Sequence, residues 1–300
     1  MVSALSLADT THSVATADTV RMVFTGDILL DRGVRRVVER RGGMDAVFSH
    51  SIDSLLAAAQ VVVGNLECPA THVHAPAMKR FVFRGEPGWL PALRRHGFTH
   101  LNLANNHSVD QGRGGLLSTL AEVRRAGMTP VGAGATMSEA AAPVLLCSSP
   151  RPVWLMASNR LALENFALLP HRASVSQEPL DSLCRRIRRL KKSDSTAIVV
   201  VSLHWGQEHA LRPVTMQRME AHALVDAGAD LLVCHHPHTL QTIEHYRDSH
   251  IYYSIGNFIF DQSAPLNRRA CVVAVTVTKD GLTVETVPID IRQCVPHIAR

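Results

Sequence analysis

The chain has 300 residues, of which 46% are hydrophobic and 19% are charged. That length can form one large α/β domain or two small ones, and the hydrophobic content excludes disordered and fibrous architectures. The net charge of +5 fits an anionic partner only weakly, because much of the positive excess lies in the single run 185–192.

The start of the chain shows neither a helical nor a strand period, so we expect residues 1–18 to form a mobile leader and residues 19–300 to form one domain. The leader lacks the basic start and apolar centre of a secretion signal, and no later stretch approaches the ~20 apolar residues of a membrane helix. The six cysteines form no CxxC pair, which favours a reducing compartment. We therefore expect a cytoplasmic protein with no membrane partner.

Short apolar runs alternate along the chain with longer segments of helical period. The runs predict strands buried on both faces, at residues 20–25, 61–64, 99–104, 198–203, 231–234 and 251–255. The segments between them predict helices, at residues 44–59, 115–126, 180–191 and 216–227, and Gly97, Gly127 and Gly228 are typical helix ends. Such alternation favours a layered α/β fold.

The end of the chain has a different pattern. Residues 271–290 alternate with period two on both sides of Lys279, Asp280 and Gly281, which predicts an antiparallel hairpin. The basic run 185–192 keeps apolar residues at helical spacing and has no aromatic stacking platform, so we interpret it as the solvated face of a packed helix and expect no nucleic-acid partner.

Polar side chains follow five of the predicted strands directly. They are Asp27, Glu67, Asn106 with His107, His204, and the histidines of the run His235-His236-Pro237-His238. The carboxyl ends of parallel strands open onto one crevice, so these side chains are expected to converge. Carboxylate, amide oxygen and imidazole are ligands for manganese, iron, zinc or cobalt, and a carboxylate can bridge two ions ~3.5–4 Å apart.

Each of these residues also has a structural interpretation. Asp27 could cap a turn, Glu67 could lie on the surface, and Asn106 is a common turn former. A single histidine such as His204 is more often a hydrogen-bonded core residue than a ligand. Three histidines within four residues have little packing rationale, and the structural interpretation needs five coincidences at once.

The segments GDILLDRG, NLECPAT, LNLANNHSVDQG, SLHWGQEH, GADLLVCHHPHTLQ and YYSIGNFIFDQ resemble, in order, the motifs of the poly-γ-glutamate capsule-synthesis (CapA-like) family. That family is a branch of the calcineurin-like metallophosphoesterases. The resemblance runs from about Arg21 to Gln262 and is most specific in the HHPH and GNF runs. It implies a four-layer α/β/β/α metallophosphoesterase-like sandwich.

The resemblance also implies a site for two divalent ions bridged by Glu67. Its ligands would be Asp27, Glu67 and His238 for one ion, and Glu67, Asn106, His204 and His236 for the other. His107 would be the non-ligand acid/base, and Asp110 would orient it. His235 could take the place of its neighbour His236.

Other residues near these motifs are further candidates. Leu29 stands where the wider superfamily has a histidine ligand, so one ion has fewer ligands; Asp31 could compensate, or could start a helix. Arg84 is expected to belong to the catalytic site and to hold the anionic substrate in bidentate fashion; its structural interpretation is an ion pair with Glu86. Glu208 lies close behind His204 and could line the substrate pocket.

We expect a metal-dependent hydrolase of a phosphoester or related anionic substrate, either a small molecule or a polymer. One alternative keeps the metal site but uses it in small-molecule biosynthesis, for amide-bond chemistry, dehydration or cyclisation. Another is a non-catalytic protein that binds an acidic polymer. The sequence does not indicate the oligomeric state or the identity of the substrate.

Overall fold

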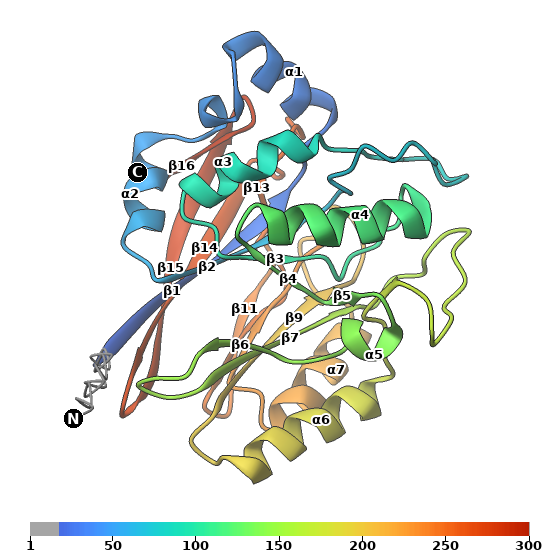
Figure 1. Ribbon diagram of the computed structural model, residues 1–300. Coiled ribbons are helices and arrows are strands. Elements are labelled where there is room, and N and C mark those ends of the chain that lie inside the picture. The colour runs from blue at the N-terminus through green and yellow to red at the C-terminus, as the bar shows by residue number, and fades with distance from the viewer. Residues whose placement is uncertain (1–17, 300) are drawn as a thin grey trace, which may run out of the picture.

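The computed structural model describes residues 18–299, so residues 1–17 of the expected leader lie outside the described part. Two β-sheets pack face to face, and helices cover the outer face of each (Figure 1). The order of layers is helix, sheet, sheet, helix. The expected four-layer α/β/β/α sandwich is therefore confirmed.

The first sheet contains eight strands in the order β16-β15-β14-β1-β2-β3-β4, with β13 pairing to β1. Strands β1 to β4 pair in parallel, so their carboxyl ends share one edge. The strand bounds are β1 (Thr19–Ile28), β2 (Val61–Leu66), β3 (His100–Asn102), β4 (Thr129–Val131), β13 (Asn257–Ile259), β14 (Arg269–Thr278), β15 (Gly281–Arg292) and β16 (Val295–Ile298).

The second sheet contains six strands in the order β11-β12-β10-β9-β7-β6, of which β12, β10, β9 and β7 pair in parallel. A separate two-stranded sheet joins β5 to β8. The bounds are β5 (Ala133–Gly134), β6 (Val144–Cys147), β7 (Val153–Asn159), β8 (Ser174–Val175), β9 (Ile198–His204), β10 (Leu231–Val233), β11 (Ile243–Tyr246) and β12 (Ser249–Tyr252).

The helices divide between the two outer faces (Figure 1). The first sheet is covered by α1 (Arg32–Arg41), α2 (His50–Ala57), α3 (Leu90–Arg95) and α4 (Gly112–Arg125), and the second by α6 (Leu180–Ser193) and α7 (Thr215–Asp226). The short elements are η1 (Met44–Val47), η2 (Pro87–Trp89) and α5 (Met137–Ala140).

Three apolar clusters fill the spaces between the layers, and alternate residues of one strand belong to different clusters. Val23 of β1 packs on the helix side of the first sheet, whereas Phe24 packs between the two sheets. Leu183 and Ile187 of α6 pack against the second sheet. Both faces of each sheet are thus buried, which explains why the strands are continuous apolar runs.

The six predicted strands and the C-terminal hairpin are confirmed, and Thr278 pairs with Gly281 across the hairpin turn. Three of the four predicted helices are also confirmed. The fourth, predicted at residues 44–59, is divided into η1 and α2 because Phe48 and Ser49 adopt extended backbone conformations. The basic run lies on α6, whose Arg185, Arg188 and Arg189 are exposed, as expected for a solvated helix face.

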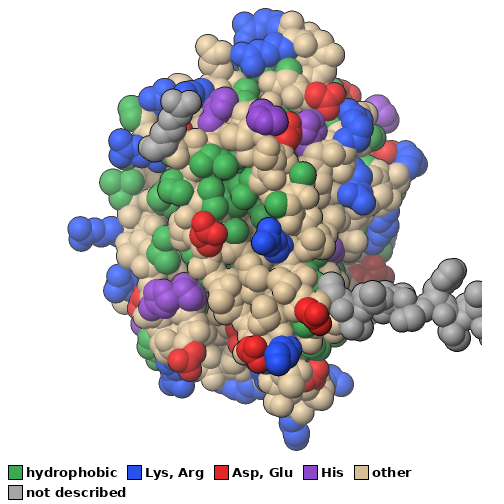
Figure 2. All heavy atoms as spheres, turned by 90° about the vertical axis from the view of Figure 1, so that its left-hand side faces the viewer, with side chains coloured by type: hydrophobic (Ala, Val, Ile, Leu, Met, Phe, Trp, Pro, Cys, Tyr) green, Lys and Arg blue, Asp and Glu red, His purple; other side chains and the backbone are tan. Residues whose placement is uncertain are grey.

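The face at the left of Figure 1 carries a group of apolar side chains among charged and histidine side chains (Figure 2). A cavity of about 270 Å³ between β1, β14 and α2 is lined in part by Met22, Leu55 and Val275. None of the predicted site residues lines it. The chemistry predicted from the sequence lies instead at the ends of the parallel strands.

Candidate metal centre

The predicted ligands lie where the parallel strands of both sheets end. Asp27 belongs to the end of β1, Glu67 directly follows β2, and His204 is the last residue of β9. His236 and His238 follow β10 in a short loop. Because the sheets pack face to face, these five side chains converge from both layers and all are buried.

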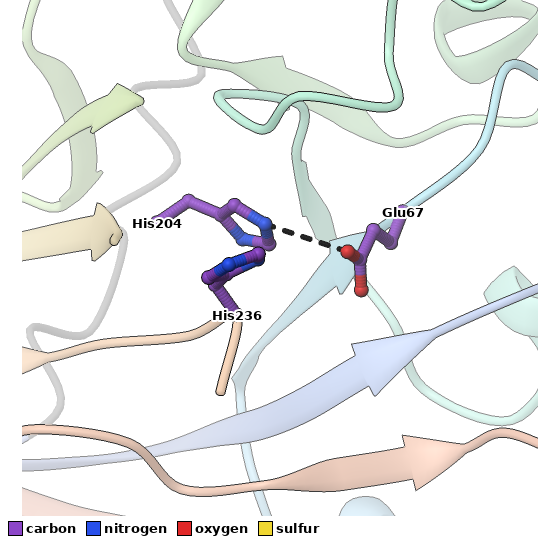
Figure 3. A group of neighbouring side chains, drawn as sticks. All are labelled: Glu67, His204 and His236. Carbon is purple, nitrogen blue, oxygen red and sulfur yellow. Dashed lines mark ion pairs between the residues drawn. The ribbon is translucent and has the colours of Figure 1, made fainter. Parts of the chain in front are cut away.

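Two overlapping groups of potential metal ligands contain Glu67. One group contains Glu67, His204 and His236, and the other contains Asp27, Glu67 and His238; within each group the ligand atoms lie within 4.8 Å of one another. Oε1 of Glu67 is 3.4 Å from Nε2 of His204 and 3.7 Å from Nε2 of His238. Glu67 points toward the two imidazole rings of the first group (Figure 3). It is the one residue common to both groups.

Asn106 and His235 also reach this centre. Oδ1 of Asn106 is 3.0 Å from Nε2 of His204, so the amide oxygen lies beside the first group. Nδ1 of His235 is 3.2 Å from Oδ1 of Asp27. His235 is not a member of either group, and its main chain pairs with that of His204. Of the two adjacent histidines, His236 is therefore the one placed among the potential ligands.

Several polar atoms of the centre have no hydrogen-bond partner among residues 18–299. They are both carboxylate oxygens of Glu67 and Nδ1 of His236. Burying such groups without a partner is costly, and a divalent cation is the kind of partner that carboxylate and imidazole atoms accept together. The donors present therefore fit divalent metal ions.

Burial and neighbouring charges set the protonation of the centre. Burial raises the pKa of Glu67 well above its usual value. Burial also lowers the pKa of His204 well below its usual value and that of His236 to about 3, so both rings are neutral, as ligands must be. For His238 burial lowers the pKa, but the charges of Glu67 and Asp27 outweigh it and raise the pKa to about 9.

The loop after β10 holds its histidines in an uncommon backbone conformation. His236 has a φ of 97° and His238 a φ of 57°, in the left-handed region that non-glycine residues rarely adopt. Asn267 donates from Nδ2 to the main-chain oxygen of His238 at 2.9 Å and so secures the loop. Such strain persists at functional sites when the surroundings enforce it.

His107 and Asp110 form a hydrogen-bonded pair next to the centre. Nδ1 of His107 is 2.9 Å from Oδ2 of Asp110, and the same oxygen accepts the main-chain N–H of Phe83 at 2.7 Å. Burial lowers the pKa of His107. The sequence resemblance implied this pair, and the structure brings the two residues together.

Lys79 is a residue beside the centre that no sequence pattern indicated. Its Nζ lies 2.5 Å from Oδ1 of Asp110, donates to the main-chain oxygen of Asn106 at 3.0 Å, and is 3.4 Å from Nδ1 of His107. The side chain is 3% exposed although it belongs to a loop between β2 and α3. The loop has no helical or strand period, so no pattern in the sequence indicates that this lysine is buried.

Two asparagines that hold the potential ligands were also missed in that role. Asn65 donates from Nδ2 to Oδ1 of Asp27 at 2.7 Å. Oδ1 of Asn257 lies 2.9 Å from Nδ1 of His238, which leaves Nε2 of that ring facing Glu67. Both asparagines fall within motifs of the family resemblance, NLE and GNF. That resemblance was the only sequence feature that pointed to them.

Asp31 and Arg84 belong to none of the groups of potential ligands, and both have other partners. Oδ1 of Asp31 accepts the main-chain N–H of Arg32 at 2.8 Å and thereby caps α1, as its helix-start interpretation requires. Arg84 donates to Oε1 of Glu86 at 3.1 Å and to the main-chain oxygen of Thr71 at 3.0 Å. Both residues line a cavity of about 360 Å³ that none of the potential ligands lines. Arg84 thus has the ion pair of its structural interpretation.

Comparison with known proteins gives a family match and several similar proteins. A family model described as "Bacterial capsule synthesis protein PGA_cap" matches residues 21–262. The chain is 34% identical to the PGA biosynthesis protein CapA of Bacillus subtilis (strain 168), over 93% of this chain and 73% of that one. It is 33% identical to the capsule biosynthesis protein CapA of Bacillus anthracis, over 92% of this chain and 68% of that one.

Two solved structures with low sequence identity are similar to this chain in fold. A hypothetical protein from Thermus thermophilus aligns with a TM-score of 0.53 and 13% identity, over 89% of this chain and 99% of that one. The NAD nucleotidase of Haemophilus influenzae aligns with a TM-score of 0.50 and 8% identity, over 94% of this chain and 60% of that one. These likenesses support the metallophosphoesterase-like fold. Within residues 18–299, no helix has the length and apolar character needed to cross a membrane.

Proposed function

Because the chain belongs to the bacterial capsule synthesis protein family PGA_cap, we propose that it is a metal-dependent hydrolase of a phosphoester or related anionic substrate. The observation that carries this proposal is the position of Glu67. Its buried carboxylate belongs to both groups of potential ligands and has no hydrogen-bond partner among residues 18–299. A carboxylate in that position suits a bridge between two ions.

The donor atoms divide into two ligand sets. In this proposal one ion is held by Asp27, Glu67 and His238, and the other by Glu67, Asn106, His204 and His236. Manganese, iron, zinc and cobalt all accept such mixed oxygen and nitrogen ligands. When bound, ions of this kind act as Lewis acids that activate water and polarise the substrate.

His107 supplies the proton that the leaving group needs. Because its Nδ1 faces Asp110 at 2.9 Å, Nε2 is the ring atom left to carry that proton. Asp110 fixes the orientation of the ring, and Lys79 fixes Asp110. Asp110 and Lys79 are thus positioning residues. Arg84, which pairs with Glu86, has no assigned contact with substrate in this scheme.

The two ions are not expected to bind equally well. Leu29 occupies the position of a superfamily ligand and is fully buried in the apolar core between the first sheet and its helices. The ion at Asp27 and His238 therefore has fewer protein ligands and is expected to be the weaker. The same departure favours a second candidate function, in which one ion serves amide-bond, dehydration or cyclisation chemistry in small-molecule biosynthesis.

A metal titration tests the hydrolase. The apo-protein is titrated with Mn²⁺ or Co²⁺ and assayed with an activated phosphomonoester and an activated phosphodiester, with Glu67→Ala as the inactive control. Turnover that rises with metal, up to concentrations well above that of the protein, supports the proposal. Background rates in folded, metal-loaded protein would contradict the hydrolase and favour the biosynthetic alternative.

A further inference from the structure

Glu208 lies at the solvent side of the candidate centre. It follows β9, and its carboxylate forms a third group of potential ligands with His236 and His238, again with all ligand atoms within 4.8 Å of one another. Among the ligand groups within residues 18–299, Glu208 is the only exposed member. It therefore lies where an ion or a substrate would enter.

The backbone around Glu208 is fixed to the loop that carries the two histidines. The main-chain N–H of His209 donates to the main-chain oxygen of Pro237 at 2.8 Å. The main-chain oxygen of Ala210, the residue after His209, accepts from Oγ1 of Thr239 at 2.8 Å and from Nε2 of Gln241 at 2.9 Å. These bonds join the segment after β9 to the segment after β10, so the approach of Glu208 to the histidines is built into the fold.

Neither the carboxylate of Glu208 nor Nδ1 of His236 has a hydrogen-bond partner among residues 18–299. The nearest basic group to Glu208 is Nε2 of the adjacent His209, at 3.9 Å, which is too long for a hydrogen bond. His236 is 6% exposed, and its Nδ1 has no hydrogen-bond partner. Glu208 is exposed, as a glutamate without a function would also be. Unlike such a residue, it lies close to two buried imidazoles that carry potential ligand atoms.

We propose that Glu208, which lies beside His238, is the solvent-side ligand of the ion held by Asp27, Glu67 and His238. That ion lacks the ligand that the wider superfamily has at the position of Leu29, whereas His236, the other histidine near Glu208, belongs to the ligand set of the second ion. This inference rests on the proposed metal centre. A carboxylate oxygen is an effective ligand for divalent ions such as manganese, iron, zinc and cobalt. Because the side chain is exposed, it could also move aside and leave room at the ion for the anionic group of a substrate.

Metal binding tests this inference without any assay of turnover. The apo-protein is titrated with Mn²⁺ alone, and free Mn²⁺ is measured by electron paramagnetic resonance. Wild-type protein is expected to bind two ions with different affinities. Glu208→Gln should weaken the weaker site about tenfold or more, a loss comparable to that seen when groups around a metal are removed, and should leave the tighter site unchanged.

Glu164→Gln is the matched control, because Glu164 is also an exposed loop glutamate and belongs to none of the ligand groups. It should bind Mn²⁺ like the wild type. If the Glu208→Gln titration superimposes on that of a metal-binding wild type, the role of Glu208 is wrong while the metal centre stands. If both sites weaken equally, the assignment to one ion is wrong. A wild type that binds no Mn²⁺, Co²⁺ or Zn²⁺ overturns the metal centre and this inference together.

Discussion

Nζ of Lys79 lies 2.5 Å from Oδ1 of Asp110, and both side chains are buried. The same nitrogen donates to the main-chain oxygen of Asn106, a proposed ligand, and the second oxygen of Asp110 faces His107. One lysine from an irregular loop thus contacts both the backbone beside the candidate metal centre and the carboxylate that orients the proposed acid.

Lys79→Met should lower the free energy of unfolding by about 3–5 kcal/mol, because it leaves the Asp110 carboxylate buried without its counter-charge. The double variant Lys79→Met/Asp110→Asn should recover part of that loss, since the buried charge is gone. Urea unfolding of the wild type, both single variants and the double variant measures the coupling. Lys192→Met, at an exposed lysine, should be close to neutral. Additive losses in the double variant would contradict the coupling.

Glu67→Ala and His107→Ala should separate metal binding from proton transfer. Glu67→Ala removes the carboxylate that the proposal places between the two ions, so the purified variant should contain little metal. His107→Ala should retain metal and lose turnover about 10²–10⁴-fold, the usual contribution of a general acid or base. Elemental analysis and kcat on the same preparations provide the comparison. Equal loss of metal in both variants would make His107 a ligand.

Gly26→Ala should displace the backbone that supports the candidate centre. A Cβ at Gly26 would lie 2.1 Å from the main-chain oxygen of Gly256 and 2.9 Å from the carbonyl carbon of Asn257. The backbone next to Asp27 and Asn257 must shift, which costs about 1–3 kcal/mol or more and moves the support of His238. Thermal unfolding and Mn²⁺ affinity should both fall.

Gly88→Ala is the control for that variant, because its Cβ would meet nothing within 4 Å. It should match the wild type in both measurements. Wild-type metal affinity in a folded Gly26→Ala protein would show that the centre tolerates a shift of β1.

His100 should make stability depend on pH. Burial lowers its pKa to about 4, below the unfolded value of about 6.5. The stability that neutral His100 contributes is therefore fully present above pH ~6.5 and is lost as the pH falls through 4. The loss occurs because the unfolded state binds the proton at a higher pH than the folded state does. The full effect on the free energy of unfolding is about 3 kcal/mol. Urea unfolding at pH 7.5 and at pH 4 measures how much the free energy of unfolding falls between the two. The fall should be smaller in His100→Phe than in the wild type. Equal losses would mean that His100 titrates normally.

The sequence predicted the layers well because apolar strands buried on both faces leave a local pattern. It missed α1, in which the buried Val34, Val37 and Val38 share ten residues with five arginines and a glutamate. It also missed the burial of Lys79, because that depends on Asp110, which is distant in the sequence, and on the course of an irregular loop. Local patterns report which side of an element is buried, but not which distant side chains meet.

The potential ligands are divided between the two sheets: Asp27 and Glu67 come from the first, and His204, His236 and His238 from the second. An ion bound by both sets would cross-link the layers across the interior, much as a disulfide links two segments but reversibly. At a concentration 100 times its Kd, one such ion adds about 2.7 kcal/mol to the stability of the folded state. Chelation would therefore weaken the contact between the layers and make the chain more susceptible to proteolysis. The metal supply in the cell would then govern the lifetime of the protein as well as its turnover.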